Sequence, residues 1–196
     1  MLSIGRLTTR KGLREFVQHA LPHIVQGAPD TLLLVIGDAP TDSLHASVQT
    51  RDSIQSVADT AGIGHHLRFL GVVTDPHELA CAYECATLHI FPVRHLPGDP
   101  EGFGMVAIEA AAHGVPTIAF STGGIVDAVS PGQSGSLVTP EDYPALSKAV
   151  LHVLQSSEAP YPNCATFARN FAWPEFGTKL LRALYAERIS TPSATI

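Results

Sequence analysis

Apolar positions along the chain fall into two patterns, short continuous runs and longer runs in which they recur every three or four residues. The continuous runs predict buried strands. They lie at 2–5, 31–36, 67–71, 87–91, 115–120 and 135–138. The run 31–36 is apolar at nearly every position, which is typical of a parallel strand that is covered on both faces.

The spaced runs predict amphipathic helices. They lie at 12–24, 43–59, 76–85, 104–114, 143–155, 163–170 and 173–189, with a further short helix after Gly123-Gly124. Asp75 precedes the helix at 76–85 and has the side chain of an N-cap. Strand and helix alternate about six times, which predicts an α/β fold with a Rossmann-like open parallel sheet and helices on both faces. We expect residues 1–196 to form one domain.

Composition excludes several classes of protein. A formal net charge of −6 argues against a general nucleic-acid binder. We expect no transmembrane segment, because the apolar runs are too short to cross a bilayer. Cys81 and Cys85 lie one helical turn apart in an Ala-rich segment, where small core residues in a reducing cytoplasm explain them better than a zinc site. We therefore expect a cytoplasmic protein.

A local basic cluster contrasts with the acidic balance of the chain. Arg6, Arg10, Lys11 and Arg14 lie close together where the first helix is predicted to begin. The helix dipole disfavours cations at that end, and Arg10 and Arg14 would form a like-charge pair four residues apart. A bound diphosphate would resolve this, since it pairs with arginine and lysine together. The alternative is a basic surface patch that is screened by salt.

The segment 100–116 combines a glycine-spaced loop with an Ala-rich helix. Gly102 and Gly104 allow backbone N–H groups to approach a ligand where a helix N-terminus offers unpaired donors. Glu101 lies at the start of this helix, where a carboxylate is favourable in any case.

Glu109 lies further along the same helix. Its neighbours three and four residues away are mostly apolar, including Met105 and Ala112. A carboxylate on such a face needs a hydrogen-bond partner. Sugar-like hydroxyls would satisfy it, and so would His113, so ligand binding and structural pairing both stay open.

The loops 5–11, 71–75, 92–104 and 120–124 all follow predicted strands, and ligands of open parallel sheets collect at that edge. The unusual residues lie in or beside these loops. Asp99 and Glu101 have the spacing of a metal-binding pair, but arginine and lysine can neutralise phosphate instead, so we expect no metal and no other cofactor. Gly123-Gly124 is either a simple turn or a second site of close approach.

Several motifs together resemble a known family. Glu101 and Glu109, within Glu-Gly-Phe-Gly-Met-Val-Ala-Ile-Glu-Ala, resemble the double-glutamate motif of retaining glycosyltransferases with the two-domain GT-B fold, in particular the large group-1 (GT4-like) family. Gly5-Arg6-Leu7 with Lys11-Gly12-Leu13 is similar to the first strand–helix loop of that family. Similar segments follow at 122–127, 132–138 and 171–173, so the resemblance spans nearly the whole chain in order.

The resemblance implies a role for each matching residue. Arg6 and Lys11 would hold the diphosphate of a nucleotide-sugar donor and stabilise the leaving group, and Glu101 would face the donor sugar. These three are the expected catalytic residues. The expected donor-binding residues are Glu109 for the ribose, Val73 and Asp75 beside the base, Arg94 at the edge of the sugar pocket, and Gly102, Phe103, Gly104, Met105, Gly5, Gly123 and Gly124 around the donor.

The family transfers a sugar to an acceptor hydroxyl with retention of anomeric configuration. The chain begins on its first strand, so we expect the C-terminal donor-binding half of such an enzyme, without the N-terminal acceptor domain and inactive alone. The acceptor, whether glycan, lipid or small molecule, is not implied, and the absent domain would set any peripheral membrane contact. The alternative is a non-catalytic nucleotide or sugar-phosphate binding module on the same scaffold. A dinucleotide-binding domain fits poorly, because Gly-Arg-Leu replaces the Gly-x-Gly-x-x-Gly turn.

Overall fold

The computed structural model describes residues 1–40 and 47–189, and its centre is a parallel sheet. The six strands are β1 (Leu2–Ile4), β2 (Leu33–Ile36), β3 (Leu67–Gly71), β4 (His89–Phe91), β5 (Thr117–Phe120) and β6 (Gly135–Val138). They lie in the order β3-β2-β1-β4-β5-β6, and every neighbouring pair is parallel. The predicted Rossmann-like sheet is confirmed, with several strands shorter than their apolar runs.

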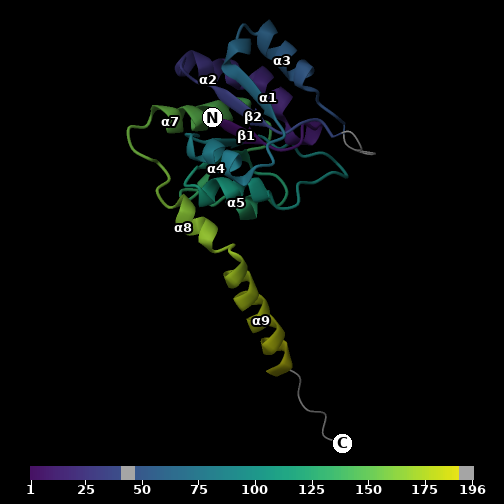
Figure 1. Ribbon diagram of the computed structural model, residues 1–196, viewed down its shortest axis with the longest axis vertical. Helices are drawn as coiled ribbons and strands as arrows, with labels where there is room; N and C mark the ends of the chain where they lie inside the picture. Colours follow the sequence, from purple (N-terminus) through teal and green to yellow (C-terminus); the bar gives the residue numbers. More distant parts are fainter. Residues whose placement is uncertain (41–46, 190–196) are drawn as a thin grey trace, which may run out of the picture.

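Helices cover both faces of this sheet (Figure 1). One face carries α1 (Leu13–His19), α2 (Leu21–Gly27), α3 (Arg51–Thr60) and α7 (Tyr143–Gln155), and the other carries α4 (Pro76–Glu84), α5 (Met105–Ala112) and α8 (Cys164–Arg169). The remaining elements are α6 (Ile125–Ala128), α9 (Trp173–Ile189) and two 3₁₀ turns, η1 (Thr9–Lys11) and η2 (Gly64–His66).

Two predicted helices differ from the structure. The helix expected at 12–24 is two helices that meet at Ala20, because Pro22 in the first turn of α2 has no N–H to donate to the turn before it. The helix expected at 43–59 begins only at Arg51, where the Thr50 hydroxyl accepts from the Ser53 N–H at 3.1 Å. Residues 43–46 of that prediction lie outside the described residues.

The core lies on both faces of the sheet. Under α4 and α5, a cluster of buried side chains joins the strands to these helices: Leu2, Ile36, Tyr83, Ala110 and Val115. Small buried residues, Ala107, Ala110 and Ala111, let α5 lie close to the sheet. Cys81, on α4, and Cys85, directly after it, are both exposed, so the prediction that they are core residues is wrong.

The C-terminal helix α9 extends away from the body of the domain (Figure 1). It exposes large apolar side chains, and Trp173 is 84% and Tyr185 61% accessible. Scattered apolar residues are normal on a surface, but a continuous stripe of them along one helix is typical of a contact surface. None of the described helices is both long and apolar enough to cross a membrane.

His89 is a polar exception in the middle of the sheet. Its side chain is fully buried, Nδ1 lies 3.2 Å from the Thr117 hydroxyl, and Nε2 has no hydrogen-bond partner among the described residues. Burial, assisted by the charge of Lys11, lowers the pKa of His89 to about 3. The folded protein therefore keeps this imidazole neutral at pH values where an unfolded chain binds a proton.

This linkage predicts a pH-dependent loss of stability. The unfolded histidine titrates near pH 6.5, so the contribution of His89 is complete above that pH and decreases as the pH falls toward about 3. Between pH 6.5 and pH 5, wild type should lose about 2 kcal/mol of unfolding free energy relative to His89→Gln. Urea unfolding at a series of pH values measures this, with His152→Gln on the exposed side of α7 as control. Parallel pH profiles for wild type and His89→Gln would contradict it.

Candidate functional site

The loops that follow β1, β3, β4 and β5 leave the same edge of the sheet, as expected for parallel strands. At this edge Lys11 and Glu101 meet. The Lys11 ammonium lies 2.8 Å from Glu101 Oε2, and Arg10 Nη1 donates to the same oxygen. The three side chains are only 16%, 12% and 8% exposed for Lys11, Glu101 and Arg10. A largely buried ionic cluster therefore joins two loops that are far apart in the sequence.

The placement of the basic residues corrects the electrostatic argument from the sequence. Arg10 and Lys11 end the η1 turn, and Gly12, with a left-handed φ of 68°, separates them from α1. Arg10 and Arg14 are thus not neighbours on one helix. Arg10 Nε also lies 3.1 Å from Asp99 Oδ1, although its N–H is not aligned for a hydrogen bond. In this structure the anions beside Arg10 and Lys11 are two carboxylates of the protein itself.

Lys11 lies in an environment that favours its neutral form more than water does. Burial lowers the pKa of Lys11, the hydrogen bond and charge of Glu101 oppose this, and the charges of Arg10 and Arg6 lower the pKa further. Its ammonium also lies 4.8 Å from the centre of the Phe91 ring, and its side chain passes over Gly5. Arg6 is exposed. An added anion would reduce the repulsion among these three cations.

The loop between β4 and α5 is held at both ends by backbone contacts. Near its start, the Thr122 hydroxyl donates to the Val93 carbonyl at 3.1 Å, and the Arg94 N–H donates to the Arg10 carbonyl at 2.8 Å. At its end, the Gly124 N–H donates to the Glu101 carbonyl at 3.1 Å. Sequence reasoning noted Gly124 but missed Thr122; a threonine directly before a Gly-Gly pair at a strand end is the signal that could have found it.

Gly123 and Gly124 lie directly against this loop. A Cβ atom built on Gly124 would be 1.8 Å from the Gly102 carbonyl oxygen, and one on Gly123 would be 2.5 Å from the Glu101 carbonyl oxygen. Such distances are impossible for a real side chain, so the Gly-Gly pair is a site of close backbone approach. Gly123 lies against Glu101, and Gly124 lies against Gly102. The Gly-Gly pair and the loop that carries Glu101, which the sequence predicts as separate sites, therefore form one structural unit.

Phe103 connects the same loop to the segment that follows α8. Its ring lies 5.5 Å from that of Phe171, which in turn packs edge-on against Phe167 of α8. Gly104 follows, with a left-handed φ of 86°, and its backbone packs against the Phe91 ring. Gly102 and Met105 flank this pair and are exposed. The loop thus reaches the start of α5 with its backbone turned by Gly104.

Arg94 makes two ion pairs with protein carboxylates. Its Nη1 lies 3.1 Å from Glu15 Oε1 of α1, and its Nε lies 3.0 Å from Glu141 Oε1. These pairs connect the loop after β4 to α1 and to the segment before α7. The sequence expectation that Arg94 borders a donor sugar stays a prediction.

Glu109 is exposed, so the expectation of an apolar surrounding is wrong. The buried stripe of α5 consists of residues 107, 108, 110 and 111, which turns Glu109 toward solvent. The Tyr83 hydroxyl donates to Glu109 Oε2 at 3.0 Å. His113, the structural partner that the sequence suggests, instead stacks on the Tyr83 ring and lies 3.6 Å from Glu84.

Two further predicted residues, Val73 and Asp75, lie in the short segment between β3 and α4. The Asp75 carboxylate accepts from the His77 and Glu78 N–H groups at 2.9 and 3.0 Å, which confirms the expected N-cap of α4. Val73 packs against the cluster beneath α4. Their expected position beside a nucleotide base stays a prediction.

Asp99 and Glu101 both pair with Arg10, and Glu101 also pairs with Lys11, so two cations of the protein offset these two carboxylates. The described residues hold no group of three or more histidine, cysteine or carboxylate side chains placed to bind a metal ion. The absence of a metal requirement stays a prediction.

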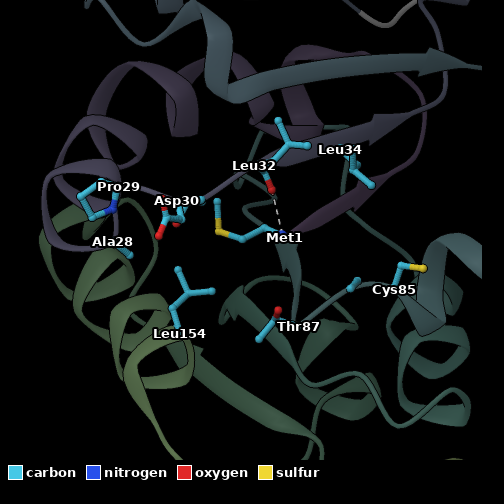
Figure 2. A pocket seen from close by; sticks show the side chains of 11 residues that line it. Met1, Ala28, Pro29, Asp30, Leu32, Leu34, Cys85, Thr87 and Leu154 are labelled. Carbon is cyan, nitrogen blue, oxygen red and sulfur yellow. Dashed lines mark hydrogen bonds between the residues drawn. The ribbon is translucent and has the colours of Figure 1, made fainter.

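A hollow of about 410 Å³ lies at the opposite edge of the sheet (Figure 2). Met1, Asp30, Leu34, Cys85 and Thr87 are among the residues that line it, and the Met1 ammonium donates to the Leu32 carbonyl at 2.8 Å. These residues precede or begin the strands. The hollow is therefore separate from the edge where Lys11 and Glu101 meet.

The chain matches the model of a known protein family over most of its length. The family model described as "Glycosyl transferases group 1" matches residues 1–156, which include Lys11, Glu101, Glu109 and both glycines of the Gly-Gly pair.

Similar proteins carry related names. The chain is 31% identical over 153 residues to a GDP-mannose-dependent α-(1-6)-phosphatidylinositol monomannoside mannosyltransferase of Mycolicibacterium smegmatis, covering 76% of this chain and 37% of that protein. Sucrose-phosphate synthase of Thermosynechococcus elongatus has a similar structure, with a TM-score of 0.70, 29% identity, and coverage of 95% of this chain and 46% of that one. Anabaena HepE in complex with UDP shares the fold, with a TM-score of 0.70, 23% identity and coverage of 96% and 48%. The chain spans less than half the length of each.

The close approach at Gly124 predicts a sharp contrast between two glycines of the site. Gly124→Ala places a methyl group into the Gly102 carbonyl, whereas Gly102→Ala places one in open space. We expect Gly124→Ala to destabilise the fold by about 2 kcal/mol through overpacking, a decrease of about 4–8 °C in Tm. Gly102→Ala should change Tm by less than about 2 °C. Thermal unfolding followed by circular dichroism measures both, and equal Tm values for the two variants would refute the contact.

Proposed function

This chain belongs to the group 1 glycosyltransferases, and from that membership we propose that it binds the nucleotide-sugar donor at the edge where Lys11 and Glu101 meet. The observation that carries the proposal is this pairing. It puts a largely buried lysine and the first glutamate of the double-glutamate motif into contact within the loops that follow β1 and β4. The chemistry proposed is transfer of a sugar from the donor to an acceptor hydroxyl.

The diphosphate of the donor is the anion that this cation cluster suits. Lys11 is partly desolvated, with Arg6 and Arg10 near enough to repel it, so a phosphate oxygen would gain from several positive charges at once. Arg6 is exposed at the same edge and can turn toward the ligand. We assign the diphosphate to Arg6 and Lys11, with no divalent metal ion needed to neutralise it.

Glu101 and Glu109 fit hydroxyl groups on the two sides of that diphosphate. A carboxylate accepts hydrogen bonds from two neighbouring hydroxyls, which suits both a sugar ring and a ribose. Glu101, beside the cations, is assigned to the donor sugar together with the backbone of Phe103 and Gly104. Glu109, on the first turns of α5, is assigned to the ribose. The names of two similar proteins, one GDP-mannose-dependent and one solved with UDP, support a nucleotide ligand.

In the proposed reaction the bond between the anomeric carbon and the phosphate oxygen breaks, and the electron pair stays on the diphosphate. Arg6 and Lys11 stabilise the charge that develops there, which is the usual source of electrostatic catalysis. The acceptor oxygen bonds to the anomeric carbon on the face that the phosphate leaves, and the acceptor proton passes to the phosphate. This gives retention of configuration.

We assign acceptor binding to a second domain. The chain covers 37% of the mannosyltransferase it resembles, which leaves room for such a domain in that relative. The exposed apolar side chains of α9 offer a surface for contact with it. We expect this chain alone to bind donor and to transfer no sugar.

A direct titration tests donor binding. Isothermal titration of the chain with UDP, GDP and ADP, in EDTA, should show binding of at least one of them, with Kd between about 1 µM and 1 mM. Each nucleotide sugar should bind like its parent diphosphate or more tightly. A protein that circular dichroism shows to be folded, but that binds none of the three, would remove the proposal.

Removing the lysine tests the phosphate role. Lys11→Ala should weaken binding of the diphosphate by about 10- to 100-fold, the range for a charge-assisted contact. It should leave the affinity for the parent nucleoside nearly unchanged. Lys148→Ala, on the exposed side of α7, is the matched control and should alter neither. Equal losses for diphosphate and nucleoside would show that Lys11 does not act on the phosphates.

A further inference from the structure

Tyr83 connects two helices through its hydroxyl group. It belongs to α4, and it donates to Glu109 Oε2 of α5 at 3.0 Å, with the Val106 carbonyl as a second acceptor at 3.5 Å. A phenol has one proton, so the shorter bond to the charged oxygen takes it. Burial, with the charge and hydrogen bond of Glu109, raises the pKa of Tyr83, which keeps that proton on the phenol.

The Tyr83 ring is held on all sides. The residue is 1% exposed and packs with Leu2, Ile36 and Ala110 beneath α4 and α5, which lie side by side in Figure 1. The His113 imidazole stacks on it at 5.1 Å between ring centres, with 7° between the planes. The tyrosine that donates this hydrogen bond is therefore fixed to the core, while the glutamate that accepts it is not.

Glu109 itself is exposed, and an exposed glutamate on a helix samples several rotamers. The bond from Tyr83 selects one of them by holding Oε2. In the described part of the chain, Oε1 accepts no hydrogen bond from another side chain. One oxygen is thus anchored to the protein and the other is presented to solvent.

We propose that Tyr83 is a positioning residue for donor binding, which orients the Glu109 carboxylate so that its outer oxygen receives the ribose hydroxyls. The proposal rests on the proposed function of this site. Holding the carboxylate before the ligand arrives reduces the loss of side-chain freedom on binding. A bond that only joined α4 to α5 would affect the stability of the fold. Its loss would not change the affinity for a ribose ligand more than the affinity for an analogue that lacks the ribose hydroxyls.

This difference gives a double-mutant cycle with three ligands. Wild type, Tyr83→Phe, Glu109→Gln and the double variant are titrated with the nucleoside diphosphate that wild type binds, with its 2′,3′-dideoxy analogue, and with pyrophosphate. Tyr83→Phe should weaken binding of the ribose ligand by about tenfold, the value of one good hydrogen bond to a charged group. Binding of the dideoxy analogue and of pyrophosphate should change by less than about twofold. In the double variant the two losses should not add, because both act on one contact.

Tyr161→Phe is the matched control. It also removes a tyrosine hydroxyl that is bonded to another side chain, here Ser136, at a residue 9% exposed in the segment before α8. It should leave all three affinities unchanged. If Tyr83→Phe does not fold, His113→Leu removes the stacked ring and its contact with Glu84, leaves the Tyr83 hydroxyl in place, and should weaken ribose binding alone, by about twofold to fourfold.

The outcomes separate the two proposals. Unchanged ribose affinity in Tyr83→Phe, or in His113→Leu where that variant is used, overturns the positioning role and leaves the proposed function standing. An equal loss for all three ligands also overturns it, because the role would then be structural. If wild type binds neither pyrophosphate nor any nucleoside diphosphate, the proposed function fails first, and this inference with it.

Discussion

The candidate site depends on one carboxylate oxygen that two cations share. Glu101 Oε2 is bonded to Arg10 and to Lys11, residues of the loop after β1, while Glu101 belongs to the loop after β4. Because all three side chains are largely buried, removing Glu101 would leave Lys11 without its carboxylate partner, and a charge stranded in this way typically destabilises a fold by about 3–5 kcal/mol. The pairing therefore holds the two loops together. It also brings Lys11, the phosphate-binding candidate, against Glu101, the sugar-binding candidate.

The remaining contacts make that pairing possible by fixing the backbone around it. Thr122 and Gly124, from the loop after β5, donate hydrogen bonds to the Val93 and Glu101 carbonyls. The loop between β4 and α5 therefore packs directly against the Gly-Gly pair. Phe103 then packs on Phe171, outside the sheet. Three neighbouring strands thus contribute one loop each, and the parallel order of the sheet is what places their ends together.

The sequence predicts the sheet well because buried parallel strands are apolar at consecutive positions, a signal that needs no knowledge of distant residues. It predicts less where local and distant contacts compete. Pro22 divides the first helix, and this effect could be read from the sequence. The position of Glu109 was predicted wrongly because Ile108 and Ala110, on either side of it, belong to the buried stripe of α5, whereas Glu109 itself is turned away from that stripe. The bond between Arg10 and Glu101 joins residues 91 positions apart, and the bond between Tyr83 and Glu109 joins residues 26 apart. Neither partner is identifiable from spacing alone, although the residue types at both positions pointed to a site.

The shared oxygen also has a consequence for ligand binding under the proposed function. A phosphate that takes Lys11 from Glu101 would leave a buried carboxylate unpaired if Lys11 were its only partner, and the binding free energy would be reduced by that penalty. Arg10 prevents this, because it bonds the same oxygen and also lies beside Asp99. The arginine still pairs with Glu101 when the lysine moves, so Lys11 can turn to a phosphate without leaving Glu101 unpaired. Under the proposed function, Arg10 thus keeps Glu101 paired whether or not a ligand is bound, while Lys11 is the cation that binds the phosphate.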